Sequence, residues 1–155
     1  MPQSNKQSSA REAATDLILT LFRVNNLLLT AGDRLVDRLG LTSARWQVLG
    51  GIADANRPQP VAWLARDMGA NRQNVQRIMN DLKEAGLVAF QTNPHHRRAR
   101  LVILTDKGKQ TFESAMRLQG PWVKRLAQGL ALEEIETAHR VLTRLRQRLD
   151  RKDEG

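Results

Sequence analysis

Apolar side chains recur at helical spacing in the first quarter of the chain. From Thr15 to Leu39 they fall at steps of three, four and seven residues, with further apolar positions that widen the stripe. The stripe consists of Leu17, Ile18, Leu21, Phe22, Val24, Leu28, Leu29, Leu35 and Leu39. This pattern predicts one long helix that ends at Gly40, since glycine is common just past the last helical residue. So wide a stripe needs more partner surface than one small domain offers, which favours contact with a second chain.

The centre of the chain has the pattern of short helices followed by a β-hairpin. Thr42 suits the N-cap of a second helix, and the two prolines of the segment 56–60 predict a loop after it. The apolar runs 87–91 and 101–104 predict two short strands. The turn between them begins at Asn93-Pro94 and carries arginines at or just after its tip. These features predict a wing with a cationic tip.

The segment that precedes this hairpin has the spacing of a helix-turn-helix. A short helix is expected from Val61 to about Met68 and a second one from Arg72 to Ala85, closed by Gly86. The small side chain of Ala65 falls where the two helices would cross. Gly69 falls in the turn, where glycine adopts positive φ without a Cβ penalty. The inner face of the second helix consists of Val75, Ile78 and Leu82.

The opposite face of that second helix is polar and has the side chains that read DNA. Amide and guanidinium groups match the base edges of a major groove, so the candidates for base readout are Gln73, Asn74, Gln76 and Arg77. Asn71 and Arg72 lie at the helix N-terminus, which favours phosphate. Arg97 and Arg98 at the wing tip are the candidates for the minor groove or its phosphates. The plain alternative for each residue is a solvated helix face.

Helical spacing returns in the last third of the chain. Thr105 is expected to cap a helix, which Gly120-Pro121 should break or kink. Glu133 and Glu134 suit the first turn of a final helix, where acidic side chains complement the helix dipole. The apolar stripe of this helix consists of Ile135, Ala138, Val141, Leu142, Leu145 and Leu149.

Composition and charge narrow the possible functions. The 155 residues include 25 Lys and Arg against 16 Asp and Glu, a formal net charge of +9 that favours a polyanionic partner. No apolar run is long enough for a membrane span, and the polar N-terminus does not read as a secretory signal, so we expect a cytoplasmic protein without a membrane partner.

Metal and catalytic sites are not expected. The chain has no cysteine. His95 and His96 are adjacent, so on a hairpin they point apart, and only His139 lies elsewhere. No nucleophile, base and acid set and no phosphate-binding glycine loop is readable. We therefore expect no metal, no cofactor and no enzymatic activity.

The chain resembles the MarR family of bacterial transcriptional regulators. The segments that carry the resemblance are 41–49 as the opening of the second helix, 61–66 with 71–75 as the helix-turn-helix, and 82–88 as the exit into the wing. The wing signature of the family is Asp, any residue, Arg, five residues and then Leu-Thr. Arg98, Leu104 and Thr105 match this signature in register, but His96 stands at the Asp position. Trp63 also departs from the family, which commonly has Glu there.

The pattern and the resemblance together predict a mainly α fold with a small β-hairpin wing, namely a winged helix-turn-helix flanked by N- and C-terminal dimerisation helices. The expected layout is a disordered N-terminus (1–10), an N-terminal dimerisation helix (11–40), the DNA-binding domain (41–105), C-terminal dimerisation helices (106–150) and a frayed tail (151–155). The resemblance implies a homodimer that binds double-stranded DNA at a pseudo-palindromic operator, often as a repressor. It also implies a small aromatic or anionic effector, whose binding residues the sequence does not identify.

Other functions remain open at this point. A non-specific, architectural nucleic-acid-binding protein would use the same fold and the same basic charge. A protein-interaction module is disfavoured, because its surface would present apolar anchors instead of an amide- and arginine-rich helix.

Overall fold

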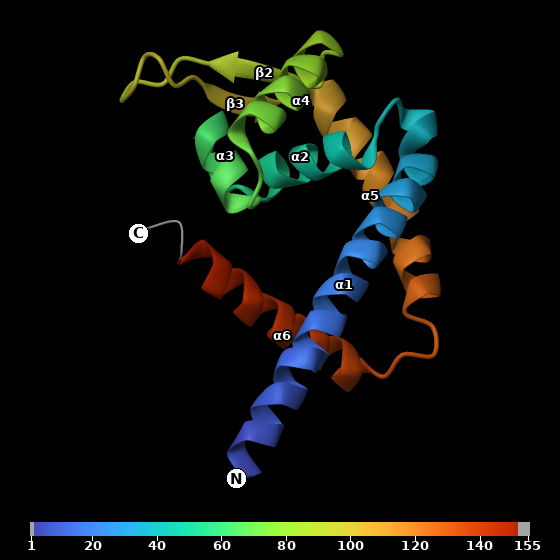
Figure 1. The fold of residues 1–155 in the computed structure, drawn as a ribbon. Coiled ribbons are helices and arrows are strands. Elements are labelled where there is room, and N and C mark those ends of the chain that lie inside the picture. The colour runs from blue at the N-terminus through green and yellow to red at the C-terminus, as the bar shows by residue number, and fades with distance from the viewer. Residues whose placement is uncertain (1, 152–155) are drawn as a thin grey trace.

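The computed structural model describes the backbone of residues 2–151 and the side chains from residue 9 onward. Its order is α1 (Pro2–Val36), η1 (Asp37–Leu39), α2 (Ser43–Asp54), β1 (Gln59–Pro60), α3 (Val61–Asp67), α4 (Arg72–Glu84), β2 (Val88–Gln91), β3 (Leu101–Leu104), α5 (Asp106–Leu126) and α6 (Leu132–Asp150). Figure 1 shows α2, α3, α4 and the strands gathered at one end, while α1 and α5 extend away from them and α6 runs back towards them from the far end in this view. The mainly helical winged fold expected from the sequence is confirmed.

The core lies inside the winged domain, where α3 and α4 pack on each other and on α2. Ala65 is buried at the crossing of α3 and α4, and Gly69 has a φ of 62° in the turn, as predicted. The inner face of α4 buries Val75, Ile78, Met79 and Leu82. Three of these four residues were predicted. Met79 completes the face because it lies one helical turn after Val75.

The wing belongs to a three-stranded antiparallel sheet in the order β1-β3-β2. β2 and β3 pair as the predicted hairpin, with Phe90 opposite Val102. The expectation of a loop over 56–60 was wrong at its end, because Gln59 and Pro60 pair with Val102 and Leu101. This strand is too short to give an alternating pattern, and proline is tolerated on an edge strand.

A close joint connects α1 to α2. α1 leads through η1 to Gly40, which has a φ of 69°, and the Thr42 side chain accepts a hydrogen bond from the Arg45 amide at 3.2 Å, so both predicted ends are confirmed. The Ser43 hydroxyl donates to the Leu29 carbonyl at 2.7 Å, and the Ser43 amide donates to the Asp33 carboxylate at 2.6 Å. These bonds fix the orientation of α2, and with it the winged domain, relative to α1.

A second close joint connects the wing to α5. The Thr105 hydroxyl donates to the Gly86 carbonyl at 2.6 Å and accepts from the Gly108 amide at 3.0 Å, which confirms Thr105 as the cap. A Cβ built on Gly108 would collide with the Leu87 carbonyl oxygen. Glycine is therefore required here by close backbone approach and not by a special φ.

Two helices are longer than the sequence predicted. α5 runs unbroken through Gly120 and Pro121, so the predicted break is wrong. Pro121 is exposed and removes one hydrogen bond, whose carbonyl partner on exposed Arg117 is open to water. α1 begins at Pro2, within the segment expected to be disordered, because residues 3–31 contain neither glycine nor proline and proline suits the first helical position. The domain boundaries stay a prediction, and residues 1 and 152–155 lie outside the described residues.

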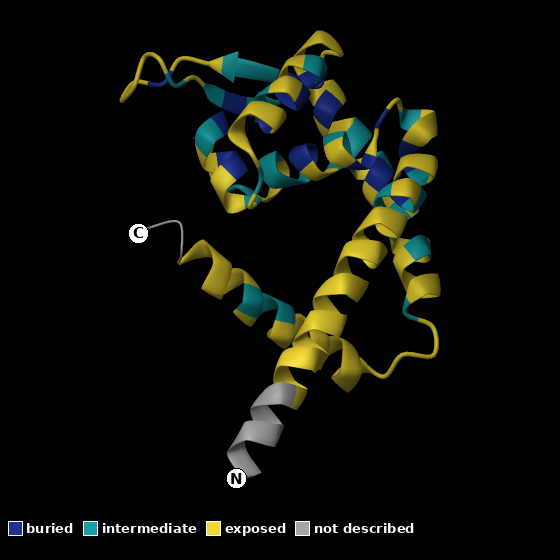
Figure 2. Ribbon diagram, viewed as in Figure 1, coloured by how far each residue is buried: buried dark blue, intermediate teal, exposed yellow. Residues whose placement is uncertain are grey.

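Many apolar side chains on the three long helices are exposed. Figure 2 colours most of the described residues of α1 and α6 as exposed. We call the set of exposed apolar side chains the apolar helical face. It comprises Leu17, Ile18, Leu19, Leu21, Phe22, Val24, Leu27 and Leu28 of α1, Met116, Leu118, Val123 and Leu126 of α5, and Leu132, Ile135, Val141 and Leu149 of α6. No described residue of α6 is buried. No helix within the described part of the chain is long and apolar enough to cross a membrane.

The close approach at Gly108 leads to a stability prediction. Gly108→Ala should lower the free energy of unfolding by about 1–3 kcal/mol, because the added methyl group must displace the backbone at Leu87. Urea unfolding at a fixed protein concentration measures this change.

Gly120→Ala is the matched control. Gly120 lies on the same helix as Gly108, and a Cβ there would meet no atom of a neighbouring segment within 4 Å. It should stabilise the protein by up to about 1 kcal/mol through helix propensity. Equal effects of the two substitutions would contradict the packing explanation.

Candidate nucleic-acid interface

The polar face of α4 is exposed because its opposite face is buried. Arg72, Gln73, Asn74 and Arg77 are exposed and Gln76 is half-buried, whereas the four apolar residues of the inner face are buried. The structure thus brings all the candidates for base readout to one side of one helix. Figure 1 shows this helix next to the β2–β3 hairpin.

Several of these side chains are already paired with one another. The Arg77 guanidinium donates to the Asn74 amide oxygen at 2.7 Å, and the Gln76 amide donates to the Asn80 amide oxygen at 3.0 Å. Asn80 was not among the predicted residues, although it lies one turn after Gln76 on the same face. These pairs restrict the rotamers of the side chains before any ligand arrives, which lowers the entropy cost of binding.

The N-terminus of α4 is capped by Asn71. Its side-chain oxygen accepts from the amides of Gln73 at 2.9 Å and Asn74 at 3.2 Å. The cap thus uses amide groups that a phosphate would otherwise contact. Asn71 keeps its side-chain NH₂ for donation, and Arg72 beside it is exposed.

The wing tip is organised by a buried asparagine. The Asn93 side chain donates to the Ala99 carbonyl at 2.9 Å and accepts from the His95 amide at 3.0 Å, and only 7% of the residue is exposed. Arg97 and Arg98 are exposed between these anchor points. In the sequence Asn93 is only a turn signal, although an asparagine that bonds the backbone two residues on is a known turn-forming device.

The base of the wing holds a second feature that sequence reasoning missed. The guanidinium of Arg100 lies over the Phe90 ring at 4.6 Å from its centroid, and the ammonium of Lys83 at 5.4 Å. These cation–π contacts connect the wing to the last turn of α4. They hold two further positive charges at the base of the wing.

Trp63 and Arg45 are two further large side chains of the winged domain. Trp63 is 44% exposed on α3 with the Arg66 guanidinium at 5.8 Å from its ring centroid, so it is not part of the core. Arg45 forms an ion pair with Asp81 at 3.4 Å, which connects α2 to the recognition-type helix α4.

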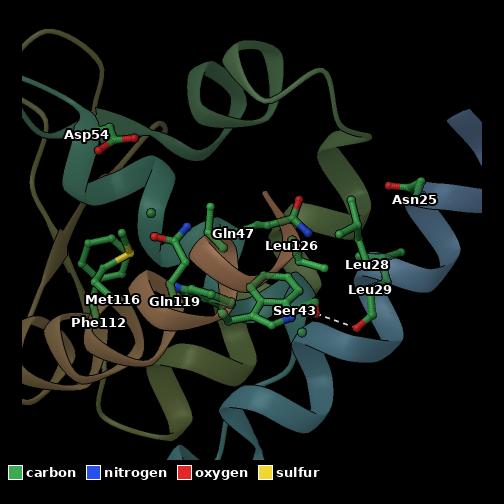
Figure 3. Close-up of a pocket in the computed structure, with 15 residues that line it drawn as sticks. Asn25, Leu28, Leu29, Ser43, Gln47, Asp54, Phe112, Met116, Gln119 and Leu126 are labelled. Carbon is green, nitrogen blue, oxygen red and sulfur yellow. Dashed lines mark hydrogen bonds between the residues drawn. The ribbon is translucent and has the colours of Figure 1, made fainter. Parts of the chain in front are cut away.

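A cavity of about 550 Å³ lies between α1, α2 and α5. Figure 3 shows its labelled side chains. Its lining consists of Asn25, Leu28, Leu29, Gly32, Ser43, Trp46, Gln47, Gly50, Asp54, Phe112, Met116, Gln119, Trp122, Val123 and Leu126. Trp46 belongs to this lining, whereas Arg23 and Arg45 do not. Within the described part of the chain, no group of three His, Cys, Asp or Glu residues is placed to hold a metal ion.

The fold and the exposed helix define a winged helix-turn-helix protein, and comparison with known proteins agrees. Residues 39–99 match the model of the MarR family. The uncharacterized protein Rv2011c of Mycobacterium tuberculosis is 38% identical over 98 residues, which cover 63% of this chain and 67% of that protein. The transcriptional activatory protein BadR of Rhodopseudomonas palustris is 32% identical over 114 residues, which cover 70% of this chain and 63% of BadR.

Solved structures share this fold over most of both chains. The MarR family transcription regulator SP03579 has a TM-score of 0.77 at 19% identity and covers 96% of this chain and 97% of its own. CouR from Rhodococcus jostii, bound to p-coumaroyl-CoA, has a TM-score of 0.75 at 21% identity, with 85% and 92% covered. A mutant MarR from E. coli, complexed with operator DNA, has a TM-score of 0.70 at 25% identity, with 84% and 96% covered. The chain belongs to the MarR family of transcription regulators.

The anchoring of the wing by Asn93 can be tested directly. Asn93→Ala removes the acceptor of the His95 amide, so exchange of that amide with solvent should accelerate roughly two- to tenfold, as expected for one hydrogen bond. Hydrogen exchange followed by NMR measures this rate.

Thr92→Ala is the control, because Thr92 is exposed beside Asn93. It should leave the exchange rate of the His95 amide unchanged. Neither variant should change the exchange rates of the amides within α4. An unchanged His95 rate in Asn93→Ala would show that the wing tip is held by other contacts.

Proposed function

We propose that this protein is a sequence-specific regulator that binds double-stranded DNA as a homodimer at a pseudo-palindromic operator and represses by occupying it. The observation that carries this proposal is the polar face of α4, exposed beside an arginine-bearing wing and backed by a fully buried inner face. A helix of this kind enters a major groove, and the wing reaches the neighbouring minor groove or its phosphates.

The roles of the individual residues follow from their chemistry and position. Gln73, Asn74, Gln76 and Arg77 read base edges, since amides pair with adenine and arginine with guanine. Arg72 and the free side-chain NH₂ of Asn71 hold the phosphate backbone at the start of α4. Arg97 and Arg98 contact the minor groove from the wing. Arg77 has donors left over after its bond to Asn74, so the pair acts on DNA as one unit.

The apolar helical face supports the homodimer. Sixteen large apolar side chains on α1, α5 and α6 are more than a third exposed, and α6 buries none of its described residues in its own chain. Exposed apolar area of this extent favours association. A second copy is the partner whose own helices offer a matching apolar face, and two-fold packing sets two α4 helices about 34 Å apart, one turn of DNA.

The cavity between α1, α2 and α5 supports control by a small molecule. Its wall includes Ser43 and Leu29, whose hydrogen bond forms part of the joint between α1 and α2. α2 in turn packs on α4 and holds it through the Arg45–Asp81 ion pair. A ligand in the cavity therefore touches the joint that orients the DNA-binding helix, and a coupling of about 1–3 kcal/mol would be enough to release DNA.

A non-specific architectural role is the second candidate, and the net charge of +9 favours it. Such a protein binds mainly through phosphates, with a steep dependence on salt and little preference among sequences. The fixed side-chain pairs on α4 favour the specific function, because they present a defined pattern of donors and acceptors.

Selection of bound DNA from a random pool tests the function. We expect a consensus with two-fold symmetry and half-sites about one helical turn apart. Arg77→Ala should weaken discrimination at one position of each half-site by about 1–3 kcal/mol. Arg98→Ala should weaken binding and leave that preference in place, which a titration of each variant against the consensus measures.

Glu136→Gln serves as the control for these variants, because Glu136 is an exposed polar residue of α6, a helix outside the candidate nucleic-acid interface. It should bind like the natural protein. A pool without any enriched sequence would support the architectural role and remove the specific one.

The homodimer leads to a separate prediction. Val141→Glu places a charge on the apolar helical face and should raise the dissociation constant of the dimer by about a hundredfold or more, because the carboxylate would lose its hydration there. Size-exclusion chromatography with in-line light scattering measures the mass of the assembly in solution.

Gln147→Glu on the same helix is the matched control, since it adds the same charge at an exposed polar position. It should leave the mass unchanged. A natural protein that runs as a monomer at micromolar concentration would contradict the proposed assembly.

A further inference from the structure

The cavity between α1, α2 and α5 is lined without any positive charge. Among its described lining residues there is no lysine, arginine or histidine, although the whole chain has 25 lysines and arginines. Its only charged lining residue is Asp54. The positive charge of the protein is thus absent from the lining of this cavity, and this absence limits the ligands that the cavity can bind.

Most of the lining is apolar and aromatic. Trp46, Phe112 and Trp122 supply rings, and Leu28, Leu29, Met116, Val123 and Leu126 supply aliphatic or thioether surface. Gly50 lies against the Phe112 ring, at a distance where a Cβ would make an ordinary van der Waals contact of 3.6 Å. A volume of about 550 Å³ lies within the range of pockets for small organic molecules, about 300–1,000 Å³. The shape and the lining fit an aromatic molecule.

The polar groups of the lining are neutral, apart from Asp54. Asn25, Gln47 and Gln119 each offer an amide that donates and accepts. The Ser43 hydroxyl already donates its hydrogen to the Leu29 carbonyl, so towards a ligand it can only accept. Figure 3 shows Gln47 and Gln119 among the labelled side chains of the cavity, with Asp54 at one end and Asn25 at the other.

An anionic ligand would be poorly held in such a site. A carboxylate that leaves water for an apolar cavity needs a cation or several aimed donors, and without them the cost of its lost hydration exceeds the attraction that the cavity offers. Asp54 adds repulsion at one end. An uncharged ligand with an amide or hydroxyl group loses less hydration and finds the partners that it needs in the glutamine amides.

We propose that the effector of this protein is an uncharged aromatic molecule carrying an amide or hydroxyl group, and that the cavity rejects its carboxylate counterparts. This inference rests on the proposed control by a small molecule and narrows the expectation of an aromatic or anionic effector to the first of these.

The test uses two probes of the same shape, naphthalene-2-carboxamide and naphthalene-2-carboxylate. Isothermal titration calorimetry with the full-length protein at pH 7.5 should show the amide binding about tenfold tighter or more. Because the assembled protein is used, any side chain that a second copy contributes is included. Equal or tighter binding of the carboxylate, or no binding of either probe at millimolar concentration, would overturn the proposal.

A charge placed in the wall sharpens the test. Gln119→Arg should raise the affinity for the carboxylate about tenfold or more and remove the preference for the amide. Gln119→Met keeps the length of the side chain without a charge and should leave the carboxylate weak. If a weaker helical circular dichroism signal shows that Gln119→Arg does not fold properly, the comparison of the two probes on the natural protein alone decides whether the proposal holds.

The same preparations are titrated with the DNA selected above, which separates this inference from the proposed function. Preserved DNA binding with preference for the carboxylate would refute only the chemistry assigned to the cavity. If the natural protein shows no sequence-specific DNA binding, the proposed function is refuted, whatever the calorimetry shows.

Discussion

Burial of the inner face of α4 is the constraint on which the rest of the candidate interface depends. Val75, Ile78, Met79 and Leu82 are each no more than 7% exposed, and they fix the rotation of the helix about its axis. Turning α4 by one residue would bring apolar side chains to water and polar ones into the core. The polar face of α4 is therefore aimed outward by the hydrophobic effect acting on the opposite side, and not by any contact of its own.

The position of the winged domain depends on two short joints. At the first, Ser43 bonds to both Leu29 and Asp33 and ties α2 to α1. At the second, Thr105 and Gly108 bring the start of α5 against Leu87. Both joints lie where a long helix meets the DNA-binding domain, and the first also forms part of the cavity wall. A change in the cavity and a change in the direction of the domain thus share atoms, which is the physical basis that regulation by a ligand requires.

The wing shows how one missing family residue is compensated. The family signature has an aspartate where this chain has His96, so a charged brace for the wing arginine is absent at that position. Asn93 organises the tip with two hydrogen bonds to the backbone, and Phe90 holds Arg100 and Lys83 at the base. Neutral hydrogen bonds of a buried side chain such as Asn93 are less sensitive to salt than an exposed ion pair.

The sequence by itself determined the elements, their caps and the amphipathic faces, because helical spacing, N-cap side chains and positive-φ glycines act within a few residues of one another. It predicted Thr42, Gly69 and Thr105 in their roles, and it predicted which face of α4 is buried. Only the tertiary structure decided what depends on distant residues. The pairing of Gln59 with Val102, the close approach of Gly108 to Leu87 and the cavity between α1, α2 and α5 each join segments far apart in the chain, and such contacts leave no local pattern to read.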